Sequence, residues 1–271
     1  MQLFKRKKTI SDHKETPFPI IIGGCHRSGT TLLRRILDSH SKINCPPEVK
    51  FFRDFYGDYF SDELSHLRFF DTVRQTGLNN DELLGIFGEA FVKCHALAAA
   101  KSGKPRWADK NPENVLYLAN WWKLLDGKFF FILVIRNPLD TLASMKEAKF
   151  PKTLPPGFEE LVAVYLKYIE AGLKFAKQQP EISYIIQYEK LVADPSSVVG
   201  NLMEFIGEKY EANMITAFNS TKRKSGIEDQ KISGTKSIHS GSIERWKNDL
   251  SDEEIAYVRK KCSKVMKRFA Y

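Results

Sequence analysis

The chain has 271 residues, which is enough for one large hydrophobic core. Its 42% hydrophobic and 28% charged residues fit a soluble globular protein, and no run of about 18 uncharged apolar residues predicts a membrane span. The net charge of +9 favours anionic partners, including nucleotides, nucleic acid and acidic substrates, without choosing among them. The four cysteines lack C-x-x-C spacing, so neither a zinc site nor a disulfide framework is expected.

Hydrophobic periodicity and turn residues predict alternating strands and helices along the chain. Residues 1–17 are expected to form a flexible N-terminal arm. Their basic start is followed by no apolar segment, so a secretory signal is not predicted. Strands are expected at residues 20–23, 107–109, 129–135 and 183–187. Helices are expected at residues 29–40, 81–101, 111–127, 157–178 and 194–206, and further helices are expected to start at residues 137 and 251. This order predicts one α/β domain, residues 18–271, with a mainly parallel sheet flanked by helices.

The turn after the first strand has the form of a phosphate-binding loop without its lysine. Gly24 and Gly29 have the spacing of G-x-x-x-x-G-K-[ST], and Thr31 fills the last position. Thr30 stands where the lysine of a nucleoside-triphosphate loop would be, while a cation, Arg27, stands earlier. Backbone N–H groups at a helix start bind phosphate, and the hydroxyls of Ser28, Thr30 and Thr31 add donors. The loop therefore predicts a nucleotide whose terminal group is not a γ-phosphate.

A second anion-binding segment follows the strongest strand of the sequence. Arg136 comes directly after the strand, at the sheet edge where open α/β folds bind ligands. Ser144 lies about two turns into the next helix. An arginine and a hydroxyl in this arrangement suit a phosphate monoester, although a strand-end arginine is as often a surface charge.

Together the two segments resemble the sulfotransferase family. Residues 25–32, Cys-His-Arg-Ser-Gly-Thr-Thr-Leu, resemble the family's 5′-phosphosulfate loop, and residues 134–144 resemble its 3′-phosphate segment. Tyr188 and Glu189 resemble a Tyr-Glu pair that follows a strand in the same family. The resemblance covers most of residues 20–247 and implies a P-loop-containing three-layer fold. It also implies the donor 3′-phosphoadenosine 5′-phosphosulfate, with adenosine 3′,5′-bisphosphate (PAP) as product and no metal.

Glu48, in Cys45-Pro46-Pro47-Glu48, is the candidate general base. It lies 21 positions after Arg27 (48 − 27), the spacing of the tyrosylprotein-sulfotransferase-like branch, in which an acidic residue has this role. A carboxylate within hydrogen-bond reach can take the proton of an acceptor hydroxyl. The alternative is a glutamate that only stabilises a helix N-terminus. His26 and His40 are rival bases.

Lys110, in Asp109-Lys110-Asn111-Pro112, is the candidate that stabilises the leaving group. The segment resembles an Asp-Lys-x-Pro element of the same branch, in which the lysine contacts the oxygen between sulfate and 5′-phosphate. A compact cation at that position stabilises developing negative charge. The alternative is a surface ion pair between Asp109 and Lys110.

The remaining cofactor contacts are assigned by resemblance alone. Tyr188 is expected to hold the nucleotide, and the poorly matching segment 219–247 offers Lys236, Ser242 and Arg245. The aromatic residues at 51–60 are expected to belong to the core or to an acceptor pocket. The absence of an anchor-like segment predicts a cytoplasmic, bacterial enzyme.

The predicted function is transfer of a sulfuryl group to a carbohydrate, tyrosyl or small-metabolite hydroxyl. The oligomeric state is not predicted. The alternatives are a P-loop kinase or other phosphotransferase and a non-catalytic protein that binds anionic glycans or nucleic acid. The missing lysine argues against the kinase, and the presence of Glu48 and Lys110 argues against a binding protein without activity.

Overall fold

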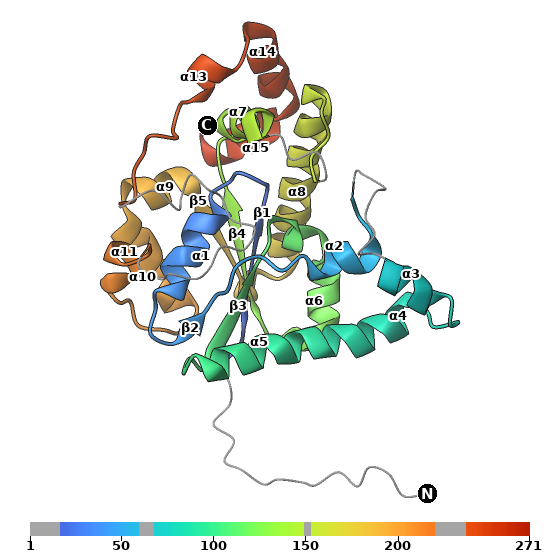
Figure 1. The fold of residues 1–271 in the computed structure, drawn as a ribbon. Helices are drawn as coiled ribbons and strands as arrows, with labels where there is room; N and C mark the ends of the chain where they lie inside the picture. Colours follow the sequence, from blue (N-terminus) through green and yellow to red (C-terminus); the bar gives the residue numbers. More distant parts are fainter. Residues whose placement is uncertain (1–16, 60–67, 149–152, 220–236) are drawn as a thin grey trace, which may run out of the picture.

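A five-stranded parallel sheet forms the centre of the molecule (Figure 1). The computed structural model describes residues 17–59, 68–148, 153–219 and 237–271. The sheet has the order β2-β3-β1-β4-β5. Its strands are β1 (Ile20–Gly24), β2 (Ile43–Asn44), β3 (Arg106–Lys110), β4 (Phe130–Ile135) and β5 (Ser183–Gln187). The sequence does not predict β2, because a two-residue strand is too short to show an alternating pattern.

Helices cover both faces of this sheet, so the expected α/β architecture is confirmed (Figure 1). They are α1 (Thr30–Asp38), α2 (Phe51–Tyr56), α3 (Arg68–Arg74), α4 (Asn80–Leu83), α5 (Glu89–Lys101), α6 (Leu118–Leu125), α7 (Pro138–Ala148), α8 (Phe158–Gln178), α9 (Tyr188–Ala193), α10 (Pro195–Phe205), α11 (Asn213–Thr216), α13 (Trp246–Asp249), α14 (Asp252–Lys261) and α15 (Ser263–Phe269). A π-helical turn, η2 (Leu84–Gly88), joins α4 to α5, and η3 (Pro112–Leu116) and η4 (Pro180–Ile182) are 3-10 turns.

The hydrophobic core has two halves, one on each face of the sheet. Along β1, Ile20 and Ile22 belong to the half that includes α1 and α10, whereas Ile21 belongs to the half that includes α6 and α8. Side chains of successive strand residues point to opposite faces, so a strand covered on both sides must be apolar throughout. This requirement explains the uninterrupted apolar runs of β1 and β4.

The single helix expected at residues 111–127 is replaced by two elements. The 3-10 turn η3 comes first, and α6 starts only at Leu118. Asn111 stands at the N-cap position of η3, but its side chain makes no hydrogen bond to the start of that turn. It donates instead to the carbonyl of Val49, at 2.7 Å, and to the carboxylate of Asp109. The tertiary contacts of Asn111 thus override its local capping tendency.

The helical stretch Asn80–Lys101, formed by α4, η2 and α5, is long and apolar enough to cross a membrane by length and composition alone. Its most apolar 18-residue window has a mean hydropathy of 1.4, and 28% of that window is buried. Its buried residues are Leu83, Leu84, Gly88, His95 and Ala99.

The predicted arm lies outside the described residues except for Pro17, and residues 220–236 of the poorly matching segment 219–247 also lie outside them.

Candidate active site

The carboxyl ends of β1, β3 and β4 lie side by side and bring the predicted site residues together. β1 pairs with β3 through Ile22 and Lys110, and with β4 through Gly24 and Val134. The phosphate-type loop follows β1, and Arg136 follows β4. The parallel sheet therefore brings together three segments that are far apart in the chain.

The loop between β1 and α1 has two residues with positive φ. Arg27 has φ 65°, which is uncommon for a residue with a side chain, and Gly29 has φ 91° at the N-cap of α1. The amide of Ser28 donates to the carbonyl of Cys25 at 3.2 Å. Strained backbone of this kind persists where the surrounding structure imposes it, and it often marks a functional site.

Both glycines of the loop pattern are required by close contacts. A Cβ on Gly24 would lie 2.5 Å from the carbonyl oxygen of Val134, and one on Gly29 would lie 2.3 Å from Cδ2 of Tyr188. The Tyr188 ring, at the start of α9, also faces the guanidinium of Arg136 at 4.7 Å. Tyr188 thus contacts both the loop and the strand-end arginine, the two parts that the sequence assigns to the nucleotide.

The two predicted anion segments are bonded to each other. Nη1 of Arg136 donates to the carbonyl of Arg27 at 3.0 Å, and Nε of Arg27 donates to Oγ of Ser144 at 3.0 Å. Ser144 therefore pairs with Arg27, whereas the sequence groups it with Arg136. Arg136 also donates to the carbonyl of Ser242, which brings the residue 242 backbone to the site.

Lys110 joins the loop to the candidate base. Its ammonium donates to Oγ1 of Thr31 at 3.1 Å and forms an ion pair with Oε1 of Glu48. The Lys110 side chain is buried, so the expected alternative of a surface pair with Asp109 is wrong. Asp109 contacts His95, Asn111 and Asn114 instead.

Glu48 lies ahead of α2 without capping it. The N-cap of α2 is Lys50 and has no side-chain cap bond, so the helix-terminus alternative has no support from the hydrogen bonds. The rival His26 is buried and its ring contacts the hydroxyl of Tyr168 at 3.3 Å. Burial lowers the pKa of His26 to about 3, which makes its imidazole a weak base. His40 contacts Lys209 and Glu211, at the other end of α1.

Sequence reasoning missed a set of charged and polar residues beside Glu48. Lys50 contacts Glu48 at 3.5 Å and Glu113 at 3.0 Å, and Arg53 contacts Glu113 at 3.2 Å. Burial by itself would raise the pKa of Glu113, but the neighbouring cations, Lys50 foremost, lower it to about 2. The only sequence signal was proximity, since Lys50 follows Glu48 by two positions and Glu113 follows Lys110 by three.

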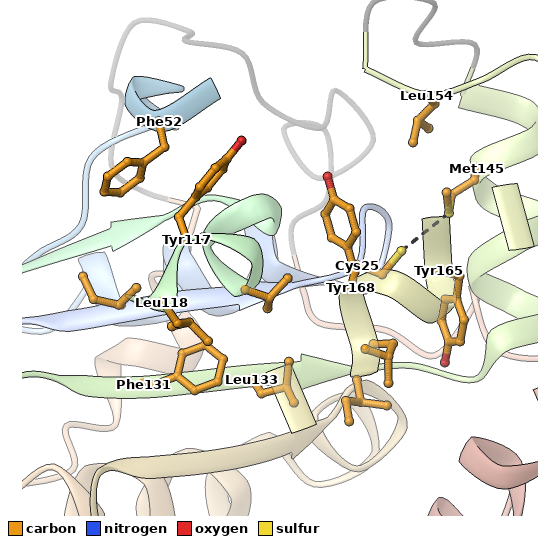
Figure 2. Close-up of a cluster of buried hydrophobic side chains, with 14 of the residues drawn as sticks. Cys25, Phe52, Tyr117, Leu118, Phe131, Leu133, Met145, Leu154, Tyr165 and Tyr168 are labelled. Carbon is orange, nitrogen blue, oxygen red and sulfur yellow. Dashed lines mark hydrogen bonds between the residues drawn. The ribbon is translucent and has the colours of Figure 1, made fainter. Parts of the chain in front are cut away.

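The aromatic residues after Glu48 are mostly core. The Phe52 ring stacks on Tyr117 with centroids 5.1 Å apart, and Phe55 is fully buried. Figure 2 shows this cluster, in which the hydroxyls of Tyr117 and Tyr168 point to the same side, away from Phe131 and Leu133. Phe60 lies outside the described residues.

Two predicted cofactor residues remain, Lys236 and Arg245. Lys236 lies outside the described residues. The guanidinium of Arg245 forms ion pairs with Glu147 and Asp249, and its contact with the nucleotide stays a prediction.

The family model described as "Sulfotransferase family" matches residues 19–212. The chain belongs to the sulfotransferase family. A putative protein-tyrosine sulfotransferase of Caenorhabditis briggsae is 25% identical to this sulfotransferase chain over 244 residues, which are 87% of this chain and 83% of the relative. The predicted family membership is thereby confirmed, and the chain is an enzyme of that family.

Two solved structures share the fold of this sulfotransferase. The sulfotransferase domain of the Synechococcus PCC 7002 olefin synthase superposes with a TM-score of 0.69 at 19% identity, over 96% of this chain and 97% of that domain. Mouse sulfotransferase SULT7A1 complexed with PAP superposes with a TM-score of 0.50 at 12% identity, over 92% of this chain and 84% of that one. At these identities the likeness establishes the fold alone, and it agrees with the expected P-loop-containing sheet.

Proposed function

We propose that this chain transfers a sulfuryl group from 3′-phosphoadenosine 5′-phosphosulfate to an acceptor hydroxyl, with Glu48 as the general base. The observation that carries the proposal is the position of Lys110. Its ammonium lies between Thr31 of the phosphate-type loop and the Glu48 carboxylate. A cation that contacts both groups can stabilise charge on the leaving oxygen and also lie next to the base. The mouse family member bound to PAP supports the choice of donor.

The residues of the loop fit an anionic nucleotide. Oγ of Ser28 is buried and has no hydrogen-bond partner among the residues that the structure describes, and the same holds for Nε of Arg136. Burial lowers the pKa of Arg136, as expected for a guanidinium held in a site of low polarity. A buried donor without a partner is costly unless a ligand satisfies it. Ser28 to Thr31 would therefore hold the 5′-phosphate, and Arg136 with Tyr188 and Ser144 the 3′-phosphate side.

The chain's own residues account for the transfer. The donor, when bound, supplies an electrophilic sulfur and PAP as its leaving group. Glu48 accepts the proton of the acceptor hydroxyl while that oxygen bonds to sulfur and the bond from sulfur to the bridging phosphate oxygen breaks. Lys110 and Arg27 stabilise the negative charge that this oxygen gains. Most of the rate acceleration would come from positioning and from these fixed charges.

Two variants separate base from donor binding. Glu48→Gln should lower turnover by about 10²–10⁴-fold, the usual effect of a general base, while PAP binds as in the wild type. Arg136→Ala should weaken PAP binding by about 10–10²-fold, because it removes hydrogen bonds from a charged donor. Calorimetry with PAP and with Mg-ATP gives the affinities, and a tyrosine-containing peptide and 4-nitrophenol serve as acceptor probes.

The outcomes discriminate among the functions. Unchanged turnover of Glu48→Gln would remove Glu48 as the base, and unchanged PAP affinity of Arg136→Ala would remove the 3′-phosphate assignment. Tight binding of Mg-ATP but not of PAP would favour a phosphotransferase. PAP binding without transfer to any probe would favour a binding protein.

A further inference from the structure

Five charged side chains, three of them buried and two only slightly exposed, form a continuous series beside the phosphate-type loop. Arg53 contacts Glu113 at 3.2 Å, Lys50 contacts Glu113 at 3.0 Å and Glu48 at 3.5 Å, and Glu48 pairs with Lys110. We call these five residues the charge row. Their signs alternate, and none of the five side chains is more than 11% exposed. Buried charges are retained only when each has a partner, so the row acts as a unit.

The two carboxylate oxygens of Glu48 have different partners within this row. Oε1 faces Lys110 and Oε2 faces Lys50. Under the proposed function, Lys110 also interacts with the leaving oxygen. It therefore interacts with a group of the donor as well as with Glu48. Lys50 differs from Lys110, because both of its partners, Glu48 and Glu113, are residues of the chain.

We propose that Lys50 is a positioning residue that orients the Glu48 carboxylate for proton transfer, and that Glu113 keeps Lys50 in place. This inference rests on the proposed role of Glu48 as the base. A base must be held close to its productive geometry, and a side chain locked by neighbours achieves this better than a free one.

The segment after β3 is well suited to hold the base. Lys110 is the last residue of β3. Asn111 is the next residue, and Glu113 follows two positions later. Glu113 holds the Lys50 side chain, and Asn111 donates to the backbone carbonyl of Val49, which lies between Glu48 and Lys50. One short segment therefore carries the lysine for the leaving oxygen and also fixes the segment that bears the base.

A purely structural role for Lys50 makes a different prediction. When Lys50 is removed, Arg53 keeps its ion pair with Glu113 and its hydrogen bond to the hydroxyl of Tyr168. The position of α2 therefore does not depend on Lys50 alone. Lys50→Met keeps the length of the side chain and leaves Glu113 with a cation. It is therefore a better test than Glu113→Gln, which leaves two cations buried without their shared carboxylate.

The experiment compares the wild type with Lys50→Met, Lys50→Arg and the control Lys123→Met. Lys123 is an exposed lysine that pairs with the exposed Asp81 at 3.0 Å. Lys50→Met should lower kcat about 10²-fold with 4-nitrophenol or a tyrosine-containing peptide, the size expected when a base is misplaced by about 1 Å. Its affinity for PAP should stay within about twofold, because the donor contacts are intact. Lys50→Arg should recover most of the rate, and Lys123→Met should match the wild type.

Crystal structures of the PAP complexes give a readout that needs no acceptor. In Lys50→Met the Glu48 carboxylate should leave the orientation that it has in the wild type, while Thr31 and Arg136 keep theirs. An unmoved Glu48 with wild-type turnover would overturn the inference, as would a loss of PAP affinity equal to the loss of turnover. A wild type that binds PAP but modifies neither probe would count against the proposed function, and the two crystal structures would still decide the role of Lys50.

Discussion

The loop side of the site and the charge row meet at Lys110, but they use different interactions. On the loop side, donors come from the backbone of residues 25–29 and from hydroxyls, and the Ser28 hydroxyl has no partner among the described residues. In the charge row every member faces an opposite charge. The loop side therefore offers buried, unpartnered donors to a ligand, whereas the charges of the row are paired with one another, although Nη1 of Arg53 and Oε2 of Glu113 have no hydrogen bond among the described residues. Removing a ligand-facing donor on the loop side should act on affinity, and changes in the row should act on stability and rate.

The largest effect is expected from removing a carboxylate of the row. Glu113→Gln should lower the free energy of unfolding by about 3–5 kcal/mol, because Lys50 and Arg53 lose their shared counter-charge in a buried site. Adding Lys50→Met should recover part of this loss by removing one of the two cations. On the loop side, Ser28→Ala should change stability by less than about 1 kcal/mol, because its hydroxyl bonds nothing described. Urea unfolding measures all three variants, and equal losses for Glu113→Gln and Ser28→Ala would contradict the comparison.

A smaller effect is expected where the loop contacts Tyr188. Gly29→Ala places a side chain at φ 91° and against the Tyr188 ring, and these two penalties together should cost about 2–5 kcal/mol. Gly103→Ala is the matched control, because Gly103 has φ 68° but no atom within 4 Å of an added Cβ. The control should show only the conformational penalty, about 1–2 kcal/mol.

Thermal or urea unfolding gives both costs, and PAP calorimetry should show weaker binding for Gly29→Ala only. If the two variants lost the same stability, the contact between Gly29 and Tyr188 would not constrain the loop.

The last effect depends on pH and is expected from His26 of the loop. Burial lowers the pKa of His26 from 6.5 to about 3, so between these pH values the unfolded chain binds one proton more than the folded protein. The free energy of unfolding therefore falls as the pH falls through this range, by about 1.4 kcal/mol per pH unit from this residue. His26→Asn should remove that part of the slope.

Urea unfolding at several values between pH 4 and pH 7 measures the slope. His239→Asn, at an exposed position, is the control and should keep the wild-type slope. A wild-type slope in His26→Asn would show that His26 is protonated as readily in the folded protein as in the unfolded chain.

The predicted strands at 20–23 and 129–135 were found because uninterrupted apolar runs leave few other options for a covered parallel sheet. The missing lysine of the loop and the arginine after β4 were also readable, because strand ends and glycine spacing are local signals. The single helix predicted at 111–127 was wrong: a 3-10 turn precedes α6, and the side chain of Asn111 bonds the carbonyl of Val49, which is distant in the chain.

The sequence by itself determined four of the five strands of the sheet, the phosphate-type loop and the identities of Glu48, Lys110 and Arg136 as candidates. Only the tertiary structure decided which charges meet. It paired Ser144 with Arg27, buried Lys110 between Thr31 and Glu48, and brought Lys50 and Glu113 together. The physical reason is that backbone patterns are set by neighbours in the chain. A buried ion pair depends on which distant side chains share a site of low polarity.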